Sequence, residues 1–331
     1  MSEGMLEVAL ISSIKVIFVI AVVMTGCAYS TYMERKVVAR LQHRMGPTYA
    51  GPYGLLQPIA DAVKLIFKED IVPNRVEHII FALAPIVSFV PALLTFVVVP
   101  FGGEIELFGY QIQMVGSDLN IGILFVFAVT SLGVYGIVLA GWSSGSKYSL
   151  MGGIRSSAQM ISYEVGYGLS IIGVVLVANT LSLRELVESQ ATFGSWLIWK
   201  QPLGFLLYLT CATAETNRAP FDMPEAESEL VGGYHTEYSS MRFAMFFMGE
   251  YANMLAVAAI GATLFLGGWQ GPYLPPVVWL ILKVIAFMFF FIWLRATLPR
   301  FRYDQLMNFG WKVLFPLALL NTMVTAALVM L

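Results

Sequence analysis

Long apolar segments recur along this sequence, and they constrain the fold more than any other feature. A helix that crosses a bilayer needs about 20 predominantly apolar residues. Only 12% of the 331 residues are charged and 58% are hydrophobic, whereas a soluble domain carries about 25% charged residues. The pattern therefore predicts an all-α polytopic membrane protein, with a single membrane domain over residues 1–331. We expect eight spans, at residues 9–33, 79–101, 119–142, 157–178, 202–214, 241–266, 277–298 and 311–330.

Basic residues set the orientation of these spans. With eight spans and both termini outside, 15 of the 19 Lys and Arg residues fall in the loops on the inner side. Such an excess is the positive-inside pattern of membrane proteins. The fifth segment, 202–214, is shorter than a full span, but omitting it would invert every later segment and destroy the charge bias. We therefore expect the fifth segment to cross the membrane.

The first inner loop, residues 34–77, is predicted to contain a helix of its own. The first span should continue past the lipid as a helix until Gly46-Pro47, because proline cannot extend a helix. From residue 55 to 70, apolar residues then recur with helical spacing on one face and charged residues on the other. Sixteen residues with this pattern favour an amphipathic helix that lies in the interface, in contact with membrane lipid.

A second inner loop, residues 214–241, is acidic. Between Cys211 and Tyr251 the sequence has seven carboxylates but only two fixed cations, Arg218 and Arg242. Repulsion and burial both favour the protonated form of a carboxylic acid, which suits proton exchange. The imbalance therefore makes this loop the first place to look for function. The carboxylates are Glu215, Asp222, Glu225, Glu227, Glu229, Glu237 and Glu250.

Two carboxylates within the spans share one predicted depth. Glu164 lies nine residues beyond Arg155 and Glu250 eight beyond Arg242, which puts each roughly 12–14 Å inward from the inner face. A charge near the bilayer centre costs about 2.5–3.5 kcal/mol on insertion scales. We therefore expect these two residues and Glu215 to exchange protons or to line a hydrated cavity. The alternative is that each carboxylate only hydrogen-bonds a neighbouring helix.

No redox or metal chemistry is predicted for this chain. Cys27 and Cys211 are too few for a thiolate cluster or a zinc site. The histidines, His43, His78 and His235, are dispersed, and neither a P-loop nor a dinucleotide fingerprint occurs. We therefore expect no catalytic residue, no metal, no bound cofactor and no nucleic-acid partner. A hard cation held by carboxylates alone is the open alternative.

Four stretches of the sequence resemble one family of membrane subunits. They are ERKVVARLQHRMGPTYAGPYGLLQPIADAVKLIFKED (34–70), RSSAQMISYEVG around Glu164, AETNRAPFDMPEAESELVGGYHTEYSSMRFAMFFMGEYANM (214–254) and LRATLPRFRYDQLMNFGWK (294–312). Over essentially its whole length the chain is similar to the quinone-channel membrane subunit of proton-pumping NADH:quinone oxidoreductase, respiratory complex I, a family with bacterial and mitochondrial members. It departs from the family at Ala39, where glycine is usual, and in the loop 48–50.

The resemblance implies roles for three groups of residues. A quinone portal and channel, framed by the first span, the surface helix and the sixth span, would involve Glu34, Arg35, Arg40, Asp61, Lys64 and Arg295. The acidic loop would line the quinone chamber and dock peripheral subunits that carry the terminal iron–sulfur cluster, through Arg218, Asp222, Tyr234, His235 and Tyr238. Proton coupling toward antiporter-like membrane subunits would begin at Glu164, Glu215 and Glu250, together with Glu225, Glu227, Glu229 and Glu237.

The resemblance also implies an enzyme subunit that has no redox centre and is not active alone. Quinone, such as ubiquinone, would be the substrate, and FMN and iron–sulfur clusters would be bound by partner subunits. We expect the chain in the bacterial cytoplasmic membrane rather than the mitochondrial inner membrane. One alternative is the homologous subunit of a membrane-bound hydrogenase or another quinone-reducing complex. A second is a stand-alone ion carrier, although the paired repeats typical of carriers are missing from the sequence.

Overall fold

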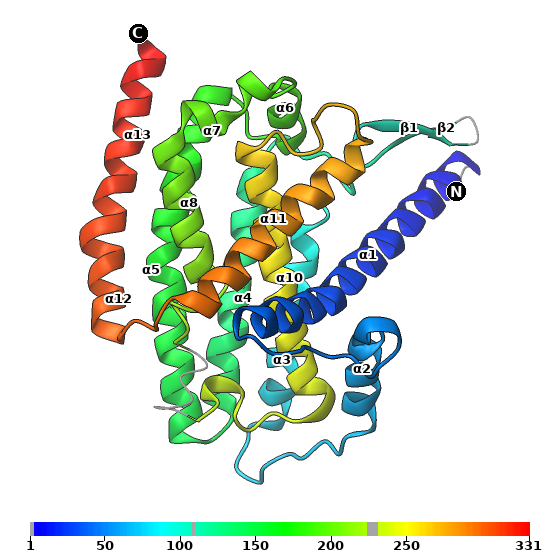
Figure 1. Ribbon diagram of the computed structural model, residues 1–331, viewed down its shortest axis with the longest axis vertical. Coiled ribbons are helices and arrows are strands. Elements are labelled where there is room, and N and C mark those ends of the chain that lie inside the picture. The colour runs from blue at the N-terminus through cyan, green and yellow to red at the C-terminus, as the bar shows by residue number, and fades with distance from the viewer. Residues whose placement is uncertain (1–2, 108–109, 224–230) are drawn as a thin grey trace.

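The computed structural model describes residues 3–107, 110–223 and 231–331, and within these ranges it is a bundle of long helices (Figure 1). Seven helical segments are long and apolar enough to cross a membrane, which confirms an all-α polytopic membrane protein. They are α1 (Glu3–Leu41), α3 (His78–Thr95), α4 (Gly122–Ser143), α5 (Lys147–Ala178), α10 (Ser240–Phe265), α11 (Pro276–Thr297) and a last segment that joins α12 (Tyr303–Phe309), a π-helical turn (Gly310–Leu314) and α13 (Phe315–Met330).

The fifth predicted span, residues 202–214, is a helix at the predicted position but a short one. With 14 residues, α8 (Pro202–Glu215) falls below the length of about 20 that a full span needs. In Figure 1, α8 runs beside α5 in the opposite direction and returns the chain toward the end of the bundle at which α10 begins. The helix stops there because Asn217 has a φ of 51° and Pro220 has no backbone N–H to donate. Residues 216–223 are consequently not helical.

The first inner loop contains the predicted surface helix. It is α2 (Gln57–Phe67), slightly shorter than the predicted 55–70, and none of its residues is buried. Its apolar residues Ile59, Val63 and Phe67 are all exposed. The preceding helix, α1, ends at Leu41, five residues before the predicted stop, and a short 3₁₀ turn (Pro52–Gly54) leads into α2. An exposed apolar stripe on an amphipathic helix is what contact with a bilayer interface requires.

Small elements gather at the opposite end of the bundle (Figure 1). A two-stranded antiparallel hairpin pairs β1 (Glu104–Leu107) with β2 (Tyr110–Gln113). The all-α prediction missed it because two strands of four residues give too weak a periodic signal in the sequence. Two short helices, α6 (Leu183–Glu188) and α7 (Leu197–Lys200), and a 3₁₀ turn (Phe193–Ser195) lie at the same end.

Helix α10 forms the centre of the bundle and packs against α1, α3 and α11 (Figure 1). Most of its second half is buried, including an alanine-rich run from Ala256 to Ala262. Small side chains let helix backbones approach closely, which is how helices associate where lipid supplies no hydrophobic driving force. The central position of α10 puts its polar residues inside the protein rather than in lipid.

Two buried polar side chains cap the end of α10. The Gln190 Nε2 group donates to the carbonyl oxygens of Thr263 and Leu264 at 3.1 and 3.3 Å. The Lys283 ammonium on α11 donates to the carbonyl oxygens of Leu266, Gly268 and Gln270, at 2.6, 2.8 and 2.7 Å. The last carbonyls of a helix have no partner within it, so these contacts stabilise the end of α10.

Candidate functional site

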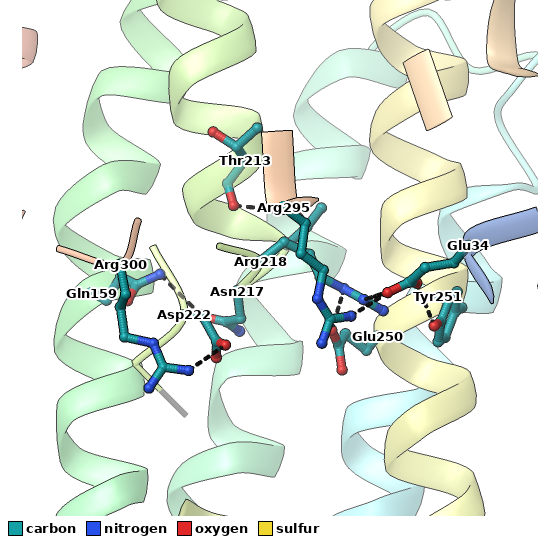
Figure 2. A network of polar contacts seen from close by, with 11 residues as sticks. Glu34, Gln159, Thr213, Asn217, Arg218, Asp222, Glu250, Tyr251, Arg295 and Arg300 are labelled. Carbon is teal, nitrogen blue, oxygen red and sulfur yellow. Dashed lines mark hydrogen bonds and ion pairs between the residues drawn. The ribbon is translucent and has the colours of Figure 1, made fainter. Parts of the chain in front are cut away.

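A buried arginine links three separate elements of the fold. Arg218, in the loop after α8, donates from Nη1 to both carboxylate oxygens of Glu34 on α1, at 2.9 and 3.0 Å. Its Nε lies 2.6 Å from Glu250 Oε1 on α10. Arg218 is only 4% exposed and Glu34 8%, so the ion pairs lie out of water (Figure 2). Burial opposes the charge of Arg218, but the carboxylates of Glu250 and Glu34 raise its pKa well above the ordinary value.

Glu34 receives two further contacts. Arg295, near the end of α11, pairs with its Oε1, and the hydroxyl of Tyr251 on α10 donates to its Oε2 at 2.5 Å. The guanidinium of Arg218 also lies over the ring of Tyr251, 4.5 Å from its centre, an attractive cation–π arrangement. We call Glu34, Arg218, Glu250, Tyr251 and Arg295 the arginine–glutamate network (Figure 2).

The network is more nearly neutral than the sequence indicated. Arg295 comes from a distant part of the chain and brings a second cation to Glu34. A separate ion pair joins Asp222 to Arg300, with Oδ2 and Nη2 2.8 Å apart, and Asp222 is 6% exposed. Removing one partner of such a buried pair leaves a charge without compensation, which is far more costly than breaking a surface pair.

A small, partly polar cavity lies beside the network. Its volume is about 50 Å³, and its lining includes Glu215, Glu250, Asn253, Thr130 and Asn217. A water molecule needs about 10–15 Å³ of such volume together with polar partners, so the cavity has room for several. Among the residues that the structure describes, the buried Glu215 Oε2 has no hydrogen-bond partner. A hydrated cavity would supply the partner that this carboxylate oxygen requires.

Glu164 lies next to this cavity rather than in its lining. Its carboxylate on α5 accepts a hydrogen bond from the Ser131 hydroxyl on α4, and the side chain is half-buried. Its charge is close enough to repel that of Glu215. The structure thus brings Glu215 and Glu250 into one cavity, with Glu164 as an electrostatic neighbour that also has a hydroxyl partner of its own.

The residues predicted for the portal divide into three groups. Glu34 and Arg295 belong to the buried network. Arg35 and Asp61 form an ion pair of 2.6 Å between α1 and α2, and Gln57 also donates to Asp61, at 3.0 Å. The remaining two, Arg40 and Lys64, are exposed. Neighbouring residues Glu34 and Arg35 therefore connect the interior of the bundle to the surface helix.

The predicted interface residues of the acidic loop pack largely against this chain. Tyr238 is 5% exposed and stacks on Phe81, with ring centres 4.0 Å apart and planes 8° apart. Tyr234 is buried and also lines the cavity. The half-buried His235 contacts the Gly232 carbonyl through Nδ1, and burial lowers its pKa to about 4. Glu237 is half-buried. Three predicted residues, Glu225, Glu227 and Glu229, lie outside the described residues.

Two serines at the start of α10 connect this loop to the surface helix. Ser240 donates to the carbonyl oxygens of Leu65 and Lys68 at 3.0 and 2.8 Å, and Ser239 accepts from the backbone N–H of Ile71 at 2.8 Å. These hydrogen bonds hold the end of the acidic loop against the end of α2.

Sequence reasoning missed three members of this site. Tyr251 and Arg300 complete the ion pairs, and the buried amide of Gln159 contacts the loop that carries Arg218 (Figure 2). Arg300 lies in one of the stretches that carry the family resemblance, and Gln159 lies in another. Neither type of residue draws attention by itself, because arginine at a span end and glutamine in a helix are both common. Tyr251 lies in a third one of these stretches, next to Glu250, and these were the signals available for it.

A metal site does not emerge from the described residues. Within residues 3–107, 110–223 and 231–331, no three His, Cys, Asp or Glu side chains come together in a way that could hold a metal ion. The predicted absence of a metal over the whole chain stays a prediction.

The fold and the site together define a multi-pass membrane protein that holds compensated charges and a polar cavity inside the helical bundle. The chain belongs to the NADH dehydrogenase family, whose sequence model matches residues 14–326. It is 57% identical over 302 residues to the H subunit of NADH-quinone oxidoreductase of Protochlamydia amoebophila, covering 91% of this chain and 92% of that protein. It is also 54% identical over 344 residues to one of the H subunits of NADH-quinone oxidoreductase of Koribacter versatilis, covering 97% of each. The resemblance seen in the sequence is confirmed.

Proposed function

We propose that this chain acts as the membrane subunit of a proton-translocating NADH:quinone oxidoreductase that forms the quinone access channel and the start of the proton-coupling path. Its relatives are named as subunits of NADH-quinone oxidoreductase, which favours this complex over a hydrogenase or a stand-alone carrier. In this role the chain binds no redox cofactor. FMN and iron–sulfur clusters belong to partner subunits, and quinone is the substrate.

One observation carries the proposal: Arg218 bridges Glu34 and Glu250 in a buried position. Glu34 adjoins Arg35, which pairs with the surface helix at Asp61. Glu250 lines the polar cavity with Glu215. The bridge thus joins the side from which a lipid-soluble quinone would approach to carboxylates that can exchange protons.

The chemistry of quinone reduction explains why such a bridge is useful. Reducing a quinone to a quinol takes two electrons and two protons, so negative charge develops on the head group before protons arrive. Charges in a dry environment act over longer distances than in water. New negative charge near the network would compete with Glu34 and Glu250 for Arg218, and a carboxylate that loses its cation binds a proton more readily. This response couples the quinone to the cavity.

The partners follow from the same proposal. Peripheral subunits that carry the terminal iron–sulfur cluster would dock at the acidic loop, and antiporter-like membrane subunits would continue the path beyond Glu164. Lipid would cover α2 and the outer faces of the spans. The named relatives are bacterial, which favours the bacterial cytoplasmic membrane as the location.

The test uses the assembled complex in proteoliposomes. Glu215→Gln and Glu250→Gln remove the exchangeable charge but preserve the shape of the side chain. We expect both variants to oxidise NADH normally with an acceptor that takes electrons from the flavin, and to lose most quinone reduction and proton translocation. Glu188→Gln, an exposed residue at the opposite end of the bundle, should behave as wild type. Full quinone reduction and full pumping in both cavity variants would refute the proton-coupling role.

A further inference from the structure

Gln159 on α5 is a fully buried amide that holds the loop carrying Arg218. Its exposed fraction is 0%. Its Nε2 group donates to the carbonyl oxygen of Ala214 at 2.8 Å and to that of Phe221 at 2.6 Å. These two carbonyls lie on either side of Arg218 in the sequence. One amide group therefore closes the loop across its base. Figure 2 shows Gln159 beside Asn217 and Arg218 of this loop.

Contacts within the loop shape its turns without fixing its place in the bundle. The backbone N–H of Asn217 bonds the Ala214 carbonyl at 3.2 Å, and that of Phe221 bonds the Arg218 carbonyl at 2.9 Å. Gln159 adds a tie to a long membrane helix, and Asn217 Oδ1 lies 3.3 Å from the same Nε2. The tie sits directly before Glu215 and three residues after Arg218, so it sets the backbone next to the cavity acid and the bridging cation.

We propose that Gln159 is a positioning residue for quinone reduction, which acts by holding residues 214–221 so that Arg218 reaches Glu34 and Glu250 together. The inference rests on the proposed function of the network. A buried guanidinium that serves two carboxylates at 2.6–3.0 Å tolerates little displacement, because charge-assisted hydrogen bonds depend on both distance and direction. Gln159 touches neither carboxylate, and its effect passes entirely through the loop.

The chain contains a matched control for this proposal. Gln190 is also 0% exposed and also donates from Nε2 to backbone carbonyls of another segment, those of Thr263 and Leu264. It lies at the end of α10 remote from Arg218. Gln159→Met and Gln190→Met each remove buried hydrogen bonds at similar side-chain length. Gln190→Met removes more of them, because Gln190 also donates to the Leu186 carbonyl and accepts from the Leu197 N–H. A general loss of stability would appear in both variants, whereas a positioning effect would appear only in the first.

The test combines hydrogen exchange with a double-mutant cycle, both on the assembled complex. We expect Gln159→Met, and not Gln190→Met, to accelerate amide exchange in residues 214–221. We expect Gln159→Met to lower the kcat of quinone reduction about tenfold, because displacing a positioned group is costly in rate. In a protein that already carries Arg218→Lys, Gln159→Met should lower the kcat of quinone reduction no further. Any loss of kcat that Gln190→Met causes by itself should instead multiply with the loss caused by Arg218→Lys.

Each outcome bears on one of the two proposals. Unchanged exchange in residues 214–221 of Gln159→Met would overturn the positioning role whatever the activity. Multiplying effects of Gln159→Met and Arg218→Lys would overturn it as well, because the two residues would then act independently. If Arg218→Lys alone leaves quinone reduction intact, the proposed function of the network fails, and the exchange measurement still decides whether Gln159 holds the loop.

Discussion

Arg218 and Glu34 lie 184 residues apart in the sequence and form a buried, two-pronged ion pair, with Nη1 at 2.9 and 3.0 Å from the two carboxylate oxygens. The pair ties the loop after α8 to α1, at the point where α1 leaves the apolar part of the bundle. Since Glu34 also pairs with Arg295 of α11, one carboxylate connects the first span directly to the penultimate span and to the acidic loop.

We expect Arg218→Met to destabilise the protein strongly. Breaking a buried pair by removing one partner costs about 3–5 kcal/mol, because the remaining carboxylate loses its compensation. Arg302→Met is the control, since Arg302 is 76% exposed and its ion pair with Asp304 is worth about 0–1 kcal/mol. Thermal unfolding of the complex in detergent measures both. Equal melting temperatures for the two variants would contradict a compensated buried charge at Arg218.

Asp61→Ala should separate stability from function at the surface helix. In its ion pair with Arg35, the Arg35 side chain is 47% exposed and that of Asp61 33%. We therefore expect a change in unfolding free energy of no more than about 1 kcal/mol. If α2 frames the quinone portal, the same variant should raise the KM for quinone several-fold while NADH oxidation at the flavin stays normal. Glu69→Ala, exposed on the segment that follows α2, controls for a general change of surface charge. A normal KM would argue against the portal.

Acidification should loosen the segment around His235. Burial lowers the pKa of this imidazole to about 4 from an ordinary 6.5, so the opened segment takes up a proton that the packed one excludes. Stability is therefore complete above pH 6.5 and falls as the pH drops toward 4, by up to about 3 kcal/mol.

Hydrogen exchange of residues 231–238 at several pH values, corrected for intrinsic rates, measures this loss. His235→Asn keeps a side-chain donor for Gly232 and should abolish the dependence on pH. The exposed His78, replaced by Asn, should leave it in place. An exchange profile for wild type that is flat between pH 7 and 5 would contradict the burial of a neutral imidazole.

Gly136→Ala should disturb the contact between α3 and α4. A Cβ at this position would lie 2.6 Å from the backbone nitrogen of Ser88 and 2.8 Å from its Cα, and backbone atoms cannot move aside like a flexible side chain. We expect a loss of about 1–3 kcal/mol from overpacking. Gly168→Ala meets only the Phe127 ring, at 3.9 Å, and should be neutral or stabilising because alanine favours a helix. Thermal unfolding distinguishes the two variants. An unchanged melting temperature for Gly136→Ala would mean that α3 and α4 can move apart at little cost in free energy.

Lys283→Met should weaken the far end of the bundle without touching the network. Lys283 is 6% exposed, and its ammonium donates to three carbonyls and lies 4.5 Å from the ring centre of Trp196. Each buried polar group left unpaired costs about 1–3 kcal/mol, so we expect a loss of at least about 2 kcal/mol in unfolding free energy. Lys200→Met, at an exposed residue, should change little. Retention of wild-type stability by Lys283→Met would show that water replaces the ammonium there.

Hydropathy and charge patterns predicted the elements well. Seven of the eight expected spans are long apolar helices, and the surface helix occurs at Gln57–Phe67. These features follow from sums over many residues, which tolerate local exceptions. The bounds of α8 (Pro202–Glu215) also match the expected segment 202–214. The four-residue strands of the hairpin depend on a few residues each, so the pattern did not resolve them.

The candidate site was predictable only in part. Insertion cost and the excess of acidic residues singled out Glu164, Glu215 and Glu250, and two of them, Glu215 and Glu250, line one cavity. The ion pairs of the site were not predictable from the residues. The resemblance implies a portal role for Arg295 and Glu34 but no pairing between them, and no role for Arg300, yet Arg295 pairs with Glu34 and Arg300 with Asp222. Pairing depends on how each helix is rotated about its axis, and the mean hydropathy of a segment does not report that rotation.

The sequence by itself determined that this chain is a membrane protein, which segments are apolar enough to cross the bilayer, and that acidic residues lie in or beside those segments. It could do so because transfer free energies are properties of residue types. Only the tertiary structure decided which acids are neutralised, which meet at the cavity, and that the Gln159 amide lies against the loop bearing Arg218. Those facts arise from contacts of a few ångströms between residues distant in the chain, and such contacts exist only once the helices have packed.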